Sequence, residues 1–461
     1  MALRSSSNPF PDHDPSPHAA PSPERVPAPA LLRLPRAVLG GLPRGTLDVG
    51  VGLAVLGVAA YVYLAVAGRA LGPERFAALS VVWVLVFTVG PGLFVPLEQE
   101  IGRAVAERRA RHVGGLPVLR TAALLGAVFA VGVLVLLAAA SPVIVPALFR
   151  GNGVLLVMTG LAVVSLAVAY PSRGALAGSG RFRRYGAQLS VEGALRVAVA
   201  VGLWVAGVRS TGAFALALAL PALVAALVTV PPPRRLLDDG PHASVHELSG
   251  RIGLLLGISL MTNSLVNAGP VLVQALASPS EKAAAGVFLA ALIVARVPLF
   301  LFSAVQAVML PRLASLAAVG AAHDFTRLLY RVLLLVGSIG AVGVLGCLTV
   351  GPEVIVVFFG GDFAFPRTDL VLLAVASAAY MVGVALTQVL VALDQHHRAL
   401  LAWVVGVVVL VLLTLVLHDL LLRVELGFLF GSTSAVLALA ILLRTPMAAL
   451  RGRHQPADGT S

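Results

Sequence analysis

The chain has 461 residues, of which 59% are apolar and 12% are charged, and its mean hydropathy is +0.97. The charged share is about half that of an ordinary globular domain, and the apolar residues outnumber the interior positions in which a soluble fold could bury them. The composition excludes a soluble enzyme, a nucleic-acid-binding domain and a secreted disulfide module. About twelve membrane helices of about 20 residues each would account for it.

Three residue types narrow the chemistry further. The single cysteine, Cys347, excludes an intrachain disulfide. The single lysine, Lys282, follows Glu281 and not a glycine, so it cannot belong to a phosphate-binding Walker A loop. The histidines at His242 and His396 fall in predicted loops without carboxylate or thiol partners. We therefore predict no metal site, no bound cofactor and no catalytic residue.

Residues 1–45 form a separate region that holds ten of the thirty prolines and five arginines. The first apolar run, Leu31-Leu32, is broken at once by Arg33 and Pro35, so it cannot be the continuous core of a signal peptide. We predict a disordered cytoplasmic tail, with a partner-binding segment as the alternative. Residues 445–461 are predicted to be a second cytoplasmic tail.

Twelve apolar segments of membrane-spanning length lie between these tails, and they predict an all-α, polytopic membrane protein. The approximate spans are 46–67, 76–96, 119–140, 153–171, 190–208, 212–231, 252–276, 284–310, 328–349, 369–391, 399–417 and 426–444.

The positive charges predict the orientation of these spans. With the N-terminus in the cytoplasm, the cytoplasmic tails and loops carry 24 of the 33 lysines and arginines, and the outside loops carry seven. Such a bias is typical of loops that stay on the cytoplasmic side. We therefore expect a multi-pass protein of the cytoplasmic membrane, in contact with membrane lipids, with both termini in the cytoplasm and no nucleic-acid partner.

A polar break divides the spans into two sets of six. It predicts an N-terminal lobe at 46–231, a cytoplasmic linker at 232–251 and a C-terminal lobe at 252–444. Both lobes then begin on the same side, and the second span of each ends in a similar motif, at 93–96 and 308–311. Parallel repeats with a substrate site between them are common in transporters, although two apolar helices can also be similar by chance.

Arg296 is the most informative polar residue within a span, since an ionised side chain near the bilayer centre costs at least about 2.5–3.5 kcal/mol. It lies about 12 Å along its helix from the outer end, at 1.5 Å per residue, and Pro298 is expected to kink that helix. A buried guanidinium there suits recognition of a phosphate or carboxylate. The alternative is a structural arginine held by carbonyl groups of neighbouring helices.

Two further pairs at i,i+4 spacing lie within spans. Glu192 and Arg196 share one helix face, where they can pair with each other. If this pair opens toward a cavity, Arg196 becomes a second anion ligand and Glu192 a proton-linked switch. Asn263 and Asn267 form a polar patch with Thr262 and Ser264. This patch is predicted either to join helices or to line a sugar-binding cavity.

The second span contains a candidate hinge and gate. Gly90-Pro91-Gly92 predicts a flexible break, and Pro298 marks a second hinge in the C-terminal lobe. Glu98, Glu100 and Arg103 follow the first hinge and could form ion pairs that close a cytoplasmic gate. Ordinary interfacial charge is the alternative explanation.

Four segments resemble bacterial polysaccharide-biosynthesis flippases of the multidrug/oligosaccharidyl-lipid/polysaccharide (MOP) exporter superfamily, with an actinobacterial character. These segments are 72–76, 90–100, 286–302 and 311–313, and the resemblance extends over about 45–445. It implies two six-helix lobes around a central cavity, alternating access without ATP, and a polyprenyl-pyrophosphate-linked oligosaccharide as substrate, flipped across the membrane for cell-surface polysaccharide biosynthesis. It gives Arg296 the pyrophosphate as its ligand, and a polysaccharide polymerase or glycosyltransferase as a possible partner protein.

Three other functions are considered. A multidrug/cation antiporter of the same superfamily would favour buried carboxylates, whereas the deep charges identified in the sequence are two arginines and one glutamate. A membrane glycosyltransferase or polymerase would need carboxylates on a sizeable outside loop, and the longest such loop is about 350–369. A scaffold for a biosynthetic complex is the third.

Overall fold

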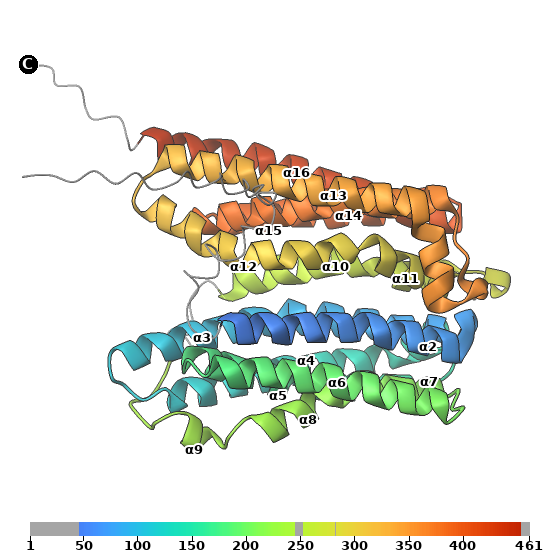
Figure 1. Ribbon diagram of the computed structural model, residues 1–461, viewed down its shortest axis with the longest axis horizontal. Coiled ribbons are helices and arrows are strands. Elements are labelled where there is room, and N and C mark those ends of the chain that lie inside the picture. The colour runs from blue at the N-terminus through green and yellow to red at the C-terminus, as the bar shows by residue number, and fades with distance from the viewer. Residues whose placement is uncertain (1–45, 245–251, 282, 453–461) are drawn as a thin grey trace, which may run out of the picture. The chain divides into compact units, whose positions relative to one another are not determined.

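The computed structural model describes residues 46–244, 252–281 and 283–452, and every element within these ranges is helical (Figure 1). Ten helical stretches are long and apolar enough to cross a membrane. One of them, Asp48–Ala110, contains two of the predicted spans, joined at Gly72. Gly72 has φ of 71°, a backbone conformation that glycine adopts without strain.

The N-terminal lobe contains the first six predicted spans (Figure 1). Its elements are α2 (Thr46–Val89), η2 (Gly90–Phe94), α3 (Val95–Ala110), α4 (Leu116–Ala147), α5 (Gly153–Gly178), α6 (Phe182–Val205), α7 (Thr211–Ala219), α8 (Pro221–Thr229) and the short α9 (Pro233–Leu236).

The C-terminal lobe contains the other six spans. Its helices are α10 (Ile252–Leu276), α11 (Ala284–Ala295), α12 (Val297–Ala318), α13 (Ala322–Phe359), α14 (Arg367–Ala392), α15 (His396–Val416) and α16 (Leu420–Gly452), with short turns η4 (Pro279–Glu281) and η5 (Gly361–Phe363). The all-helical, two-lobed architecture predicted from the sequence is confirmed. Several helices are longer than the apolar runs, and α16 continues through 445–452, where the sequence predicts a tail. The predicted spans 212–231 and 284–310 are each divided between two helices.

Both lobes are bundles whose helices run in alternating directions, so each lobe has two ends. We call the end where α9 lies the linker end, and the opposite end the far end. The described part of the linker follows the hairpin between α3 and α4: Leu116 N–H donates to Asp238 O at 3.0 Å, and the Arg108 guanidinium donates to Pro241 O at 2.9 Å. The remaining linker residues, 245–251, and the N-terminal tail at 1–45 lie outside the described residues.

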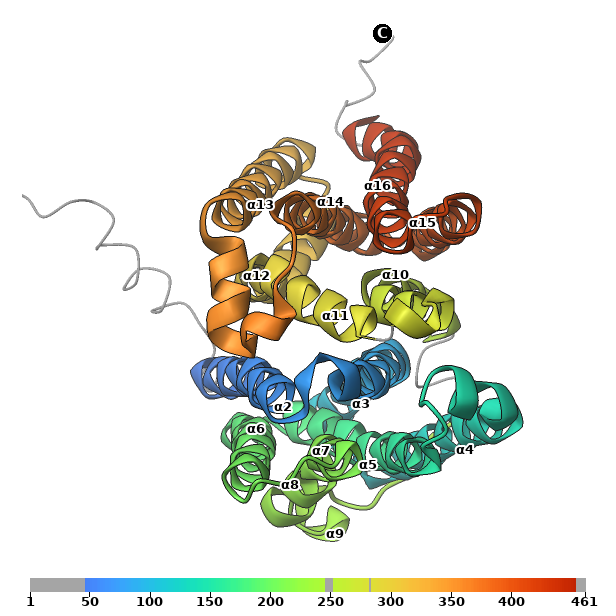
Figure 2. The ribbon, with the colours of Figure 1, turned by 90° about the vertical axis from the view of Figure 1, so that its right-hand side faces the viewer.

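Close helix contact joins the two lobes along α2, which lies beside α10 and α11 (Figure 2). A Cβ atom on Gly286 of α11 would lie 2.4 Å from Pro73 O of α2, a distance that no side chain tolerates. Glycine at 286 therefore lets α11 approach α2 closely. This approach places the end of α11, where Arg296 follows, beside the N-terminal lobe.

Candidate functional site

Arg296 lies at the break between two helices. α11 ends at Ala295 and α12 begins at Val297, while Arg296 itself has φ −102° and ψ 1°. Pro298 occupies the first turn of α12, where its missing N–H leaves no hydrogen bond unmade. The predicted kink is thus a complete break, and it positions the arginine side chain at the start of a new helix.

The Arg296 guanidinium is held on one side only. Its Nη1 donates to Asn267 Oδ1 at 3.1 Å, and its Cζ lies 5.8 Å from the centre of the Phe428 ring. Its Nε and Nη2 are buried and have no hydrogen-bond partner within the described ranges. A buried donor without an acceptor is costly, and two donors on one edge of a guanidinium are able to bind an anion.

The surroundings of Arg296 come from both lobes. Asn267, on α10, donates through Nδ2 to Phe87 O of α2 at 3.4 Å. Tyr61 of α2 and Tyr380 of α14 lie close enough to interact with the guanidinium charge. The structure therefore brings together two predicted binding residues, Arg296 and Asn267, within a largely aromatic setting. Asn263 lies one helical turn earlier and donates to Ser259 O at 2.8 Å.

Arg196 and Glu192 occupy a different place, inside the N-terminal lobe. The expected pair is present, with Arg196 Nη2 2.7 Å from Glu192 Oε1. Arg173 of α5, which the sequence analysis missed, binds the other carboxylate oxygen and lies over the Tyr170 ring. All three charged side chains are buried. In the sequence, Arg173 follows Pro171-Ser172 and therefore resembles a loop residue. Arg173 lies beside Glu192 only because α5 packs against α6 in the fold.

The predicted hinge and gate residues take regular conformations. Gly90, Pro91 and Gly92 lie in η2, a π-helical turn that keeps the chain helical where a break was expected. A π turn accommodates the missing N–H of Pro91 by widening the helix. Beyond it, Arg103 pairs with Glu100 at 2.9 Å and with Glu107 at 3.0 Å on its own helix, α3.

Glu98 is not part of these ion pairs and contacts a helix of its own lobe. Its Oε1 accepts a hydrogen bond from the Tyr185 hydroxyl of α6 at 2.5 Å. The hinge role of Gly90, Pro91, Gly92 and Pro298 stays a prediction, as does the gating role of Glu98, Glu100 and Arg103.

Glu425 is a second residue that the sequence analysis missed. It lies in α16, is fully buried, and neither carboxylate oxygen has a hydrogen-bond partner in the described part of the chain. Gln274, Ser377 and Ser432 also carry buried oxygens without such partners, on α10, α14 and α16, which contact one another. Glu425 lies one residue before the predicted span 426–444, so extending that span by one residue would have placed a carboxylate inside it.

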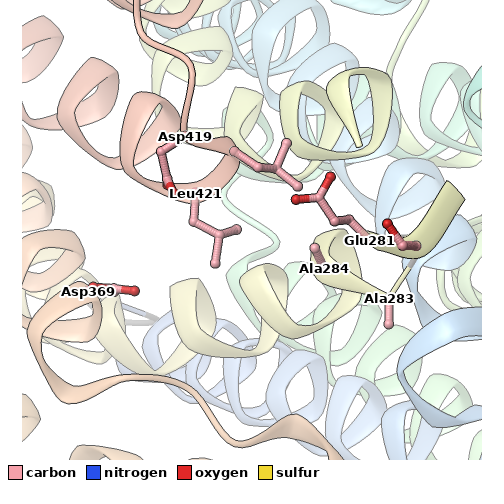
Figure 3. Close-up of a pocket in the computed structure, with 8 residues that line it drawn as sticks. Glu281, Ala283, Ala284, Asp369, Asp419 and Leu421 are labelled. Atoms are coloured by element: carbon pink, nitrogen blue, oxygen red, sulfur yellow. The ribbon is translucent and has the colours of Figure 1, made fainter. Parts of the chain in front are cut away.

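An acidic pocket opens at the far end of the C-terminal lobe. Glu281, Asp369 and Asp419 line it together with the start of α11 (Figure 3). Hydrogen bonds from the hydroxyl and backbone N–H of Ser278 lower the pKa of Glu281 from its ordinary value. A carboxylate stabilised in its charged form gives this pocket a negative potential near neutral pH.

Comparison with known proteins identifies relatives over most of the chain, although no protein-family model matches it. "Uncharacterized protein Rv3630" of Mycobacterium tuberculosis (strain ATCC 25618 / H37Rv) is 30% identical over 390 residues, covering 80% of this chain and 86% of the relative. "Uncharacterized protein Rv1510" of the same strain is 29% identical over 421 residues, covering 89% and 94%.

Solved structures with the same fold are multidrug resistance MATE family transporters of the MOP superfamily. An inward-facing one has a TM-score of 0.68 at 16% identity, covering 88% of this chain and 99% of that chain. An outward-facing one has a TM-score of 0.63 at 17% identity, covering 88% and 95%. The resemblance to the MOP superfamily is thus confirmed at the level of fold. The chain belongs to the family of the mycobacterial protein Rv3630 and has the fold of the MATE transporters.

Proposed function

We propose that this protein is a membrane transporter that flips a polyprenyl-linked glycan, carried on phosphate or pyrophosphate, across the cytoplasmic membrane for cell-surface polysaccharide biosynthesis. The observation that carries the proposal is Arg296, whose Nε and Nη2 are buried at the contact between the lobes and have no acceptor among the residues that the structure describes. In a transporter with two lobes, a substrate site between them can be reached from either side in turn.

The residues around Arg296 support a glycan-bearing anion. The Phe428 ring lies 5.8 Å from the guanidinium carbon, and Tyr61 and Tyr380 lie within range of the guanidinium charge. Such rings offer apolar faces to sugars and isoprenoid chains, while tyrosine hydroxyls can bond sugar hydroxyls. Asn267 fixes the guanidinium so that its free edge stays available. A polymerase or glycosyltransferase partner and cytoplasmic termini belong to the same proposal.

The test is lipid flipping in proteoliposomes. Fluorescent polyprenyl phosphate and polyprenyl pyrophosphate oligosaccharides are added separately, and their transbilayer movement is followed by chemical quenching of the outer leaflet. Arg296→Ala should abolish movement, and Arg296→Lys should restore it only in part because lysine lacks the planar fork. Arg331→Ala, an exposed arginine of α13, is the matched control and should behave as wild type. Movement of neither lipid by the wild type would refute the proposal.

A cation-coupled multidrug antiporter is the second candidate function. It is favoured by Glu425, a fully buried carboxylate whose oxygens have no partner within the described residues. A buried carboxylate in a membrane helix needs a proton or another cation. In this case, ethidium efflux driven by a proton or sodium gradient should be lost in Glu425→Gln and kept in Glu353→Gln, which alters an exposed carboxylate of α13. Absence of gradient-driven efflux in the wild type would exclude this function.

A further inference from the structure

We infer that the transported lipid carries its glycan on a single phosphoryl group, as a phosphodiester with one negative charge, and not on a pyrophosphate. This inference rests on the proposed flippase function and specifies its substrate class. The observation behind it is that, among the described residues, the buried Nε and Nη2 of Arg296 have no hydrogen-bond acceptor and its guanidinium binds an amide oxygen and no carboxylate.

The free edge of Arg296 has the shape of one phosphoryl group. Nη1 is engaged by Asn267, which leaves Nε and Nη2. These two nitrogens carry nearly parallel N–H bonds in the guanidinium plane, along one edge, and such an edge binds two oxygens of the same tetrahedral group. The second phosphoryl group of a pyrophosphate would lie beyond this edge and would need donors of its own.

The described neighbours of Arg296 do not supply charged donors for a second group. Both ends of the Asn267 amide are engaged, Oδ1 by Arg296 and Nδ2 by Phe87 O. Tyr61 and Tyr380 are neutral and Phe428 offers a ring face, so none of them offsets a second negative charge.

Two other buried arginines, Arg173 and Arg196, are already compensated by glutamates. Arg173 and Arg196 share Glu192, and Glu98 lies near enough to Arg173 for their charges to interact. This cluster therefore has no net charge when both glutamates are ionised. It also lies within the N-terminal lobe, on α5 and α6, whereas Arg296 follows α11 of the C-terminal lobe.

The remaining buried charges lie apart from Arg296 or have the wrong sign. Arg108 is bound by carbonyl groups at the linker end, Glu100 pairs with Arg103, and Glu425 is acidic. A substrate with one negative charge would make the Arg296 site neutral. A substrate with two would leave one negative charge without a counterion in a region of low dielectric.

The experiment compares two lipids that differ only in the phosphate linkage. Wild-type protein in liposomes receives a fluorescent polyprenyl phosphate sugar or the matching polyprenyl pyrophosphate sugar, and the initial flipping rates are corrected for protein-free vesicles. We expect the monophosphate lipid to move faster by about tenfold or more, since the second charge must be buried without a partner. Arg296→Gln should slow the monophosphate lipid strongly, while Arg331→Gln should leave the preference unchanged.

The possible results distinguish failure of the single-charge inference from failure of the flippase function. A pyrophosphate lipid that moves as fast as the monophosphate lipid, or faster, overturns the single-charge inference and leaves the flippase function standing. Movement of neither lipid overturns the flippase function, and the inference with it. A preference for the monophosphate lipid that persists in Arg296→Gln would show that the choice is made elsewhere, and this also overturns the inference.

Discussion

At the scale of single residues, Glu192 and Glu107 can be compared directly, because each carboxylate is bound by two arginines. Glu192 binds Arg173 and Arg196 in the interior, where its side chain is 4% exposed. Glu107 binds Arg103 and Arg111 on the surface, where its side chain is 44% exposed. Both glutamates have two arginine partners, so a difference in their contribution to stability reports the effect of burial.

We predict that Glu192→Gln destabilises the protein far more than Glu107→Gln. Removing the charge of Glu192 leaves two guanidiniums buried without a counterion, which costs about 3–5 kcal/mol. Loss of the exposed carboxylate costs about 0–1 kcal/mol. Thermal unfolding of the purified variants in detergent measures the difference. Equal midpoints would show that water or lipid headgroups reach Glu192, and that the triad is open.

At the scale of elements, eleven of the twelve predicted spans lie in helical stretches of membrane-spanning length, because apolar length is a local property that the bilayer imposes. The twelfth, 284–310, is divided between α11 and α12. The sequence did not locate the helix ends, since α13 and α16 extend well past their apolar runs. It found the local pair of Glu192 with Arg196. The partners supplied by other helices, such as Arg173 for Glu192 and Asn267 for Arg296, depend on the tertiary arrangement, to which no spacing rule applies.

The linker is an element whose docking can be tested directly. A Cβ atom on Gly114 would lie 1.9 Å from Asp239 O, so Gly114→Ala must displace the linker from the α3–α4 hairpin. We predict a loss of about 1–3 kcal/mol, as for other overpacked sites. Protection of 237–243 from hydrogen exchange should also fall. Gly132→Ala is the control, because no heavy atom lies within 4 Å of its added Cβ. Unchanged exchange in Gly114→Ala would refute this docking.

At the scale of the whole transmembrane unit, the lobes meet at several depths along α2. At the far end, Arg69 donates to Phe358 O at 2.9 Å, and the Phe76 ring lies 5.6 Å from that of Phe363. Nearer the linker end, the Ser259 hydroxyl donates to Pro91 O of η2 at 2.9 Å. The Arg296 site lies between these contacts. If a substrate reaches Arg296 between the lobes from the far end, this aromatic contact has to separate.

The last prediction concerns this aromatic contact. Phe76 is fully buried against Phe359 and Phe363 of the other lobe, so Phe76→Ala removes apolar contacts that exist only while the far end is closed. Burial of one phenylalanine contributes about 1.5–3 kcal/mol, which is enough to shift a two-state equilibrium by about tenfold or more. Electron paramagnetic resonance measures the distance between spin labels on cysteines introduced at Asn152 and His418 in a Cys347→Ser background. In Phe76→Ala this distance should become longer.

Phe358→Ala is the control, because it removes a ring that is 51% exposed. The distance in this variant should match that of the protein with Phe76 and Phe358 intact. Identical distances in Phe76→Ala would mean that contacts elsewhere along α2 keep the far end closed, and that the aromatic cluster is packing without a gating role.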